Sequence, residues 1–414
     1  MKVRHYKRET CRLCESEDLG CVLSLEPTPP ANAFVNASRI ADEQSRFPLD
    51  VYFCRACKHV QLLDVVDPEE LFGEYVYVSG TSSVFVKHFE DYAQMCRERY
   101  NLQKGDFVVE IGSNDGTLLR FFQDAGMRVV GIDPAREIAR RATESGIETL
   151  PTFFDSTLAR KLQEERKSAK LIAANNVFAH IDDLGEVVDG VRSLLTEDGV
   201  FVFEVSYLVD VFNKTLFDTI YHEHLAYHSV GPLVPFFEAH GMELIHVSRV
   251  GSHGGSLRAV AQLKGGPHLV EASVALFIEE ERVLGLQDED SLKAFAARIN
   301  DTGEKLRTML QELKSENRKI AGFGAPAKAT TLMYHFGINS DLIDFVVDDS
   351  PLKQGLYTPG MHIPVVPASR IPEEKPDYLL LLAWNFADAI IGKHAEFREN
   401  GGKFIVPLPN LEVV

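Results

Sequence analysis

The stretch Phe107-Val-Val-Glu-Ile-Gly-Ser-Asn-Asp-Gly-Thr-Leu-Leu-Arg-Phe121 decides the fold of this chain. It begins with an apolar run, which is typical of a buried parallel strand. Gly112 and Gly116 follow, and glycine lets a turn of the backbone pass close to a ligand. Leu118 and Leu119 then begin the apolar stripe of a helix. The stretch therefore predicts a strand, a glycine turn and a helix, with a ligand at the carboxyl end of the strand.

Glu110 lies just before the first glycine of this turn and indicates the charge of the ligand. An acid at this place disfavours a phosphate, because phosphates bind where the backbone offers positive charge. It favours a ligand with positive groups, such as the ammonium and sulfonium of S-adenosylmethionine. The spacing E-x-G-x-x-x-G resembles motif I of class I methyltransferases. An ordinary tight turn is the alternative for so short a pattern.

Later strands extend the same pattern. Arg128-Val-Val-Gly-Ile-Asp133 is a second apolar run, and its acid follows Gly112 by about 20 residues, as a ribose-binding acid does in a βαβ unit. The remaining predicted strands are 148–154, 170–176 and 199–205, with a closing pair at 242–248 and 255–262. Together they predict the seven-stranded sheet of class I methyltransferases, with S-adenosylmethionine as the cofactor.

The predicted cofactor residues lie at the ends of these strands. The glycine turn and its acid are expected to line the methionine part, Asp133 to accept hydrogen bonds from the ribose, and one of two phenylalanines to lie near the adenine. The full set is Glu110, Gly112, Asn114, Gly116, Asp133, Phe153, Phe154, Asn175 and Asn176.

Four of the six cysteines form two C-x-x-C pairs, Cys11-Arg-Leu-Cys14 and Cys54-Arg-Ala-Cys57. In a cytosolic chain this arrangement favours a metal over disulfides. Four thiolates make the closed tetrahedral set of a structural Zn²⁺. A redox pair or unrelated thiols are the alternatives. Cys21 and Cys96 lie outside the pattern and are expected to be plain buried residues.

The bulk composition narrows the class of protein. A formal net charge of −18 argues against nucleic-acid binding, which needs a basic face. The sequence has no run of about eighteen apolar residues, so we expect no membrane span. The basic start has no apolar region after it and does not resemble a secretory signal. We expect a cytoplasmic protein, either a monomer or a dimer.

The predicted fold class is α/β, in four parts. Residues 1–80 are expected to form a small zinc-binding domain, and residues 81–265 the Rossmann-like class I methyltransferase domain. Residues 266–317 have the composition of a helical connector. Residues 318–414 predict a second, smaller Rossmann-like α/β domain, because Ile320-Ala-Gly-Phe-Gly-Ala-Pro-Ala-Lys328 again runs from a strand through a glycine turn into a helix.

Tyr221-His-Glu-His224 is rich in groups that can transfer protons. His180 comes just after the fourth predicted strand, where class I methyltransferases place substrate-facing residues. The spacing does not match the H-E-x-x-H zinc motif, and a structural role is the alternative for any single histidine. A carbon nucleophile needs a base to remove its proton and donors for the resulting oxyanion. The cluster therefore favours methylation of carbon.

A tyrosine-rich segment, residues 71–83, precedes the cofactor domain. It is either a linker or a segment across the mouth of the cofactor site. In the second case it offers Tyr75 or Tyr77 to a substrate.

The motifs in order cover almost the whole chain: two C-x-x-C pairs, E-I-G-S-N-D-G, N-N-V-F-A-H-I, Y-H-E-H, H-G-G-S-L-R, G-F-G-A-P-A-K and P-G-M-H-I-P-V. This order resembles the nucleotide-sugar C-methyltransferases that build branched deoxysugars such as tetronitrose. That family has a zinc-binding amino-terminal domain, a cofactor domain and a related carboxy-terminal domain. The resemblance implies methylation at C-3' of a nucleoside-diphosphate 4-keto-6-deoxy sugar, which is the expected partner.

The resemblance also implies roles for single residues. His224 would be the base, with Tyr221 and His180 as the other candidates, and Glu223 or another carboxylate would orient the imidazole. The implied sugar-site residues are Tyr221, Glu223, His224, His180 and Tyr77. The implied substrate-binding residues are Tyr75, Ser82, Lys328, Lys353 and Tyr357. No role is implied for His222.

Two other functions stay open at this stage. One is a methyltransferase of another small carbon, oxygen or nitrogen acceptor, which would bind nucleoside diphosphates weakly. The other is a zinc-ribbon scaffold that binds a protein and has no use for S-adenosylmethionine. The nucleotide could be that of thymidine, guanosine or cytidine.

Overall fold

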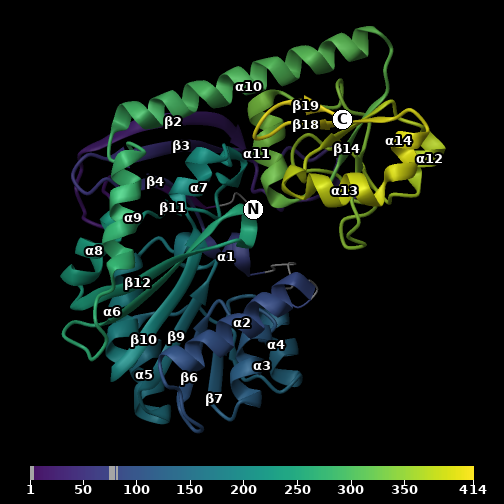
Figure 1. The fold of residues 1–414 in the computed structure, drawn as a ribbon. Helices are drawn as coiled ribbons and strands as arrows, with labels where there is room; N and C mark the ends of the chain where they lie inside the picture. The colour runs from purple at the N-terminus through teal and green to yellow at the C-terminus, as the bar shows by residue number, and fades with distance from the viewer. Residues whose placement is uncertain (1–3, 74–79, 81–82) are drawn as a thin grey trace.

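The computed structural model describes residues 4–73, 80 and 83–414 (Figure 1). A seven-stranded sheet forms its centre. In spatial order its strands are β12 (Met242–Val250), β13 (Ser256–Leu263), β10 (Leu195–Ser206), β9 (Ala169–Asn175), β6 (Phe107–Ile111), β7 (Arg128–Ile132) and β8 (Thr149–Leu150). Neighbouring strands from β10 to β8 are parallel, and β13 runs antiparallel to both β10 and β12. The predicted sheet and its closing strand pair are confirmed.

Apolar side chains alternate along these strands and bury both faces of the sheet. On one face Val108 and Leu171 pack with the apolar sides of α2 and α3, and on the other Val109 and Ile172 pack with those of α5 and α6. β8 is shorter than the predicted strand, because Pro151 follows it at once and has no N–H to donate. The helices around this sheet are α2 (Ser83–Arg99), α3 (Thr117–Asp124), α4 (Arg136–Glu144), α5 (Ser156–Arg166), α6 (Leu184–Leu194), α7 (Leu208–Asn213) and α8 (Val230–Ala239).

The amino-terminal part forms two small sheets. β1 (His5–Lys7) pairs with β5 (Asp64–Val66), and α1 (Pro68–Phe72) follows. The second sheet has the order β11 (Ala226–Tyr227), β4 (Val60–Leu62), β3 (Phe47–Cys54) and β2 (Leu19–Thr28). β11 follows β10 of the large sheet in sequence, yet it pairs with β4. The zinc-binding part and the cofactor part therefore share a strand.

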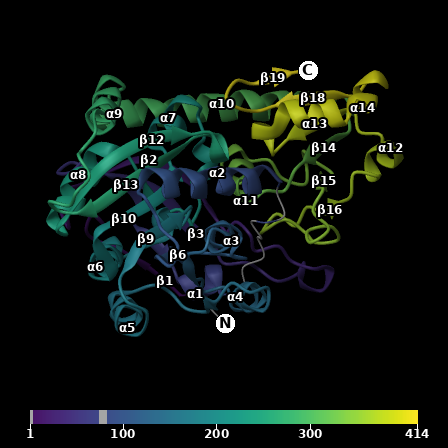
Figure 2. The ribbon, with the colours of Figure 1, turned by 60° about the horizontal axis from the view of Figure 1, so that its bottom comes forward.

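Two helices within residues 266–317 connect the cofactor part to the last sheet. α9 (Ala272–Val283) packs against β12, and α10 (Glu289–Ser315) packs against β2 and later against α11 (Ala327–Phe336). α10 runs along the top of the molecule from α9 to the carboxy-terminal sheet (Figure 2). Its buried side chains are Leu292, Phe295, Ile299, Leu306 and Leu310. Their helical spacing explains why the sequence predicted this element.

The carboxy-terminal sheet has the order β16 (Val365–Val366), β15 (Val346–Val347), β14 (Ile320–Phe323), β17 (Tyr378–Leu381), β18 (Lys403–Val406) and β19 (Glu412–Val413). All neighbours are parallel except β18 and β19. Its other helices are α12 (Arg370–Glu374), α13 (Ala387–Lys393) and α14 (Ala395–Glu399). The predicted second Rossmann-like unit is confirmed. None of the described helices combines the length and the apolar character that a membrane span requires.

Candidate active site and metal centre

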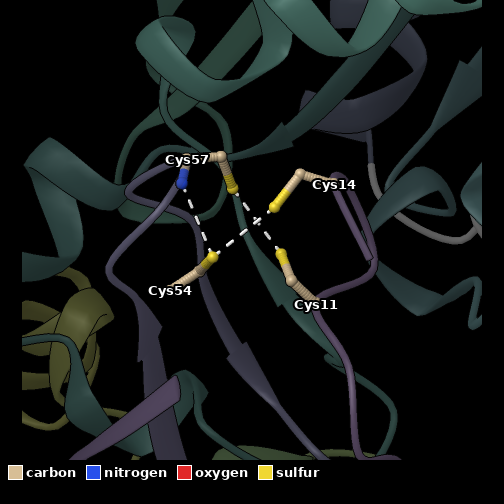
Figure 3. A group of neighbouring side chains, drawn as sticks. All are labelled: Cys11, Cys14, Cys54 and Cys57. Carbon is tan, nitrogen blue, oxygen red and sulfur yellow. Dashed lines mark hydrogen bonds between the residues drawn. The ribbon is translucent and has the colours of Figure 1, made fainter. Parts of the chain in front are cut away.

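The two C-x-x-C pairs meet at one point (Figure 3). The Sγ atoms of Cys11 and Cys57 are 3.6 Å apart, as are those of Cys14 and Cys54, and all four lie within 4.8 Å of one another. A tetrahedral Zn²⁺ with Zn–S distances of about 2.3 Å places its sulfurs about 3.8 Å apart. The four thiols therefore fit a structural zinc. Cys96 is buried as expected, whereas Cys21 is exposed on β2 because the alternation of that strand points it outward.

The glycine turn after β6 has the backbone that its sequence predicts. Gly112, Asn114 and Gly116 have φ values of 70°, 50° and 76°. A Cβ on Gly112 would lie 2.2 Å from Cγ2 of Val177, so only glycine fits there. This close approach holds the turn against the loop that leads to His180. The turn and that loop thus form one edge at the carboxyl ends of β6 and β9.

Asp133 fixes the shape of this turn. Its Oδ2 accepts from the backbone N–H of Asn114 at 2.8 Å, and its Oδ1 accepts from that of Ala135 at 2.9 Å. Burial raises the pKa of Asp133. A carboxylate oxygen can accept two hydrogen bonds, so the expected bonds from a ribose remain compatible with these contacts. That role stays a prediction.

Glu110 and Asn175 lie side by side at the ends of β6 and β9. The Asn175 amide donates to Oε1 of Glu110 at 3.4 Å, and burial raises the pKa of Glu110 well above its usual value. Asn176, next along the loop, has a φ of 56°. The Phe154 ring lies against Gly190 of α6, whereas Phe153 is 42% exposed. Phe153 is therefore the more accessible of the two phenylalanines, and contact with an adenine stays a prediction for both.

His180, Tyr221 and His224 come together from two loops. The rings of Tyr221 and His224 have centroids 4.1 Å apart, and His180 stacks on His224 at 5.0 Å and on Phe72 at 5.5 Å. Nδ1 of His224 lies 2.7 Å from the carbonyl oxygen of Thr219. When Nδ1–H donates to this carbonyl, the lone pair of the neutral imidazole is on Nε2, which can accept a proton.

Glu223 and His222 both contact the amino-terminal part of the chain. Glu223 is buried, and its Oε1 accepts from the Asn32 amide at 2.8 Å. Nδ1 of His224 contacts the Thr219 carbonyl, and the orientation of this imidazole by a carboxylate stays a prediction. His222 is buried with Nε2 3.2 Å from the carbonyl oxygen of Phe47, and burial lowers its pKa to about 4. This gives His222 a structural role.

Helix α11 of the carboxy-terminal part places Lys328 beside Asp218, three residues before Tyr221. Lys328 lies 3.7 Å from Oδ2 of Asp218 and 4.4 Å from the centroid of the Trp384 ring, and the indole N–H donates to the same oxygen at 2.7 Å. Burial lowers the pKa of Lys328. Lys353 donates to the carbonyl of Ala325 in the second glycine turn at 2.7 Å.

Of the other predicted substrate residues, the structure describes only Tyr357. Tyr357 pairs through its backbone with Val35 of the amino-terminal part. Tyr75, Tyr77 and Ser82 lie outside the described residues.

Several residues of this region had no assigned role from the sequence. Asn32 and Trp384 reach the site only through the tertiary fold, and Asp218 and Thr219 lie just before Tyr221 in a stretch without a marked pattern. A role for Asp348 could have been predicted from the sequence. Like Asp133, it directly follows a buried strand that comes after a glycine turn.

Comparisons with known families cover most of the chain. Residues 11–72 match a zinc binding domain, residues 88–247 a methyltransferase domain, and residues 251–409 a C-methyltransferase C-terminal domain. The C-methyltransferase NovU of Streptomyces niveus is 39% identical over 406 residues, which is 98% of this chain and 97% of that protein. The chain belongs to the C-methyltransferase family. It is an S-adenosylmethionine-dependent C-methyltransferase with a zinc-binding amino-terminal domain.

Solved structures resemble part of this methyltransferase. The PH0226 protein of Pyrococcus horikoshii is 18% identical with a TM-score of 0.37, covering 45% of this chain and 95% of that one. An S-adenosylmethionine-dependent methyltransferase of Clostridium acetobutylicum is 15% identical with a TM-score of 0.36, covering 44% of this chain and 92% of that one.

Proposed function

We propose that this C-methyltransferase methylates C-3' of a nucleoside-diphosphate 4-keto-6-deoxyhexose. The observation that carries the proposal is the ring cluster of His180, Tyr221 and His224, in which His180 belongs to the loop that packs against Gly112. A carbon acid needs one group that removes a proton and others that donate to the developing oxyanion. This cluster supplies groups of both kinds, with the basic nitrogen of His224 set by Thr219.

In this proposal the keto group acidifies the proton at C-3', and Nε2 of His224 accepts it. Tyr221 or His180 donates to the keto oxygen, which holds the electron pair of the broken C–H bond as an enolate. Bound S-adenosylmethionine supplies the methyl group as a sulfonium electrophile. The new bond joins C-3' to the methyl carbon, so that the products are the branched sugar and S-adenosylhomocysteine. The proton stays on His224 until water removes it.

The nucleotide is proposed to lie toward the carboxy-terminal sheet. Lys328 and Lys353 are both largely buried beside the second glycine turn, and burial lowers the pKa of each. Asp218 lies 3.7 Å from Lys328, and a diphosphate would offer both ammonium groups further negative charge. Tyr357 lies on the same side, next to the amino-terminal part. Tyr75, Tyr77 and Ser82 are proposed to complete the sugar site.

The test is methyl transfer from S-adenosylmethionine with a ¹³C-labelled methyl group. The acceptors are the thymidine, guanosine and cytidine diphosphate 4-keto-6-deoxyhexoses, each with its 4-hydroxy sugar as a matched control. We expect one keto sugar to gain a methyl carbon coupled to C-3' in the ¹³C spectrum, and no 4-hydroxy sugar to react. A methyl group on oxygen or nitrogen, or transfer to a 4-hydroxy sugar, would contradict the proposal.

A further inference from the structure

Arg12 lies between the two ligands of the first zinc pair, and its side chain is fully buried. Its Nε donates to Oδ1 of Asp182 at 3.1 Å. Its Nη1 donates to Oε1 of Gln61 at 3.1 Å and to the carbonyls of Leu62 and, at 3.3 Å, Leu225. One guanidinium therefore reaches from the zinc knuckle into two separate loops of the cofactor part.

Both of these loops carry residues of the ring cluster. Asp182 is two residues after His180, and Leu225 directly follows His224. The backbone N–H of Leu225 donates to the carbonyl of Ala179 at 2.9 Å, which joins the two loops next to their histidines. Arg12 thus contacts each histidine-bearing loop within two residues of its imidazole.

Further contacts join the same loops to the zinc-binding part. The Leu225 carbonyl also accepts from the backbone N–H of Leu62 at 2.9 Å, and β11 begins at the next residue as a strand of the zinc-part sheet. Asp182 also pairs with Arg8 at 3.2 Å. Polar groups held in this way inside a protein have few alternative arrangements.

We propose that Arg12 is a positioning residue that sets the distance and angle between His180 and His224. The zinc knuckle holds Arg12, and Arg12 holds the loops. The catalytic meaning of this geometry rests on the proposed function, but the geometry itself does not. The zinc-binding part then contributes to the chemical step through this side chain, and not only to folding.

The second C-x-x-C pair also contains an arginine, and comparison with it indicates that Arg12 has a role beyond the zinc site. Arg55 occupies the same place in Cys54-Arg-Ala-Cys57, but it is exposed and pairs with Asp18 and Glu289 at the surface. The zinc site therefore does not require the arginine after the first cysteine of a pair to be buried. Arg12 is buried, and its guanidinium donates to Asp182, Gln61 and two backbone carbonyls instead of to surface acids.

The test compares Arg12→Lys with Asp182→Asn in the full, zinc-loaded chain. Lysine keeps the charge but cannot reach both loops with one planar fork. Asp182→Asn breaks the same ion pair from outside the zinc knuckle. We expect both variants to keep their zinc and their affinity for S-adenosylhomocysteine. We expect the imidazole NMR signals of His180 and His224, identified by their loss in the two His→Asn variants, to shift in both.

The same variants are then assayed for methyl transfer. A displacement of about 1 Å far from the chemistry can cost about a hundredfold in rate, so we expect kcat to fall ten- to hundredfold with KM for S-adenosylmethionine unchanged. Arg55→Lys is the matched control and should change neither the signals nor kcat. Unchanged His180 and His224 signals would overturn the proposal, as would loss of zinc from both variants. The NMR result needs no sugar, so it stands even where the proposed substrate proves wrong.

Discussion

At the scale of single residues, two aspartates hold the two glycine turns in the same way. Asp348 accepts from the N–H of Ala325 in its turn at 2.6 Å and from that of Ser350 at 2.8 Å. Asp133 makes the corresponding pair of bonds in the cofactor turn. Each aspartate directly follows the strand that comes second in its sheet in chain order. The same local arrangement therefore occurs twice in the chain.

Asp133→Ala should weaken the binding of S-adenosylhomocysteine. The variant loses two hydrogen bonds to a charged group, each worth about 1.5–3 kcal/mol, together with the expected contacts to the ribose. We expect the Kd measured by calorimetry to rise at least tenfold while the fold is kept. Asp348→Ala is the matched control and should leave this Kd unchanged. Equal effects of the two substitutions would show that the cofactor does not use the first turn.

His222 should make the protein sensitive to acid. Its pKa is about 4 in the folded chain, against 6.5 for an ordinary histidine, so the unfolded state binds more protons between these two pH values. The free energy of unfolding therefore falls as the pH falls through this window, by about 2 kcal/mol at pH 5. His222→Gln should reduce the loss of thermal stability between pH 7 and pH 5. His240→Gln, at a partly exposed site, is the control, and an equal reduction in both variants would contradict the assignment.

At the scale of elements, the sequence predicted regular features best where a local pattern repeats. The apolar run of β6, the stripe of α10 and the two cysteine pairs each follow from spacing alone. β11 was not predictable, because a strand of two residues has no period and its partner β4 is far away in sequence. The hydrogen bond between Asn32 and Glu223 was not predictable either, because these two residues are also far apart in sequence.

Because β11 of the cofactor part pairs with β4 of the zinc-binding part, loss of zinc should disturb more than the zinc site itself. Cys54→Ser removes one ligand of the closed set, and such sites contribute directly to folding. We expect elemental analysis to find one zinc per wild-type chain and almost none in the variant, with a lower midpoint of thermal unfolding. Cys21→Ser, which changes an exposed cysteine outside the cluster, should keep its zinc and its stability. Zinc-free wild-type protein, purified without chelators, would rule out the site.

At the scale of the whole molecule, one segment of the cofactor part, residues 217–224, is bound by both the amino-terminal and the carboxy-terminal part. Asn32 of the amino-terminal part binds Glu223, and Thr331 of α11 donates to the carbonyl of Ile220 at 2.7 Å. Trp384, three residues after β17, donates to Asp218 at 2.7 Å. The three parts were predictable as separate patterns. Their meeting at this segment was not, because it depends on contacts between residues more than a hundred positions apart.

The central claim is that His224 removes the proton at C-3' in this shared site. The most direct measurement is exchange of that proton with deuterated water, followed by NMR on the nucleotide 4-keto sugar with S-adenosylhomocysteine bound. Wild-type protein should exchange it, and His224→Asn should exchange it about a hundredfold to ten-thousandfold more slowly, the usual effect of losing a general base. His222→Gln, which changes the structural histidine of the same tetrad, should exchange at nearly the wild-type rate. Exchange by His224→Asn as fast as by wild type would contradict the account and make Tyr221 or His180 the base.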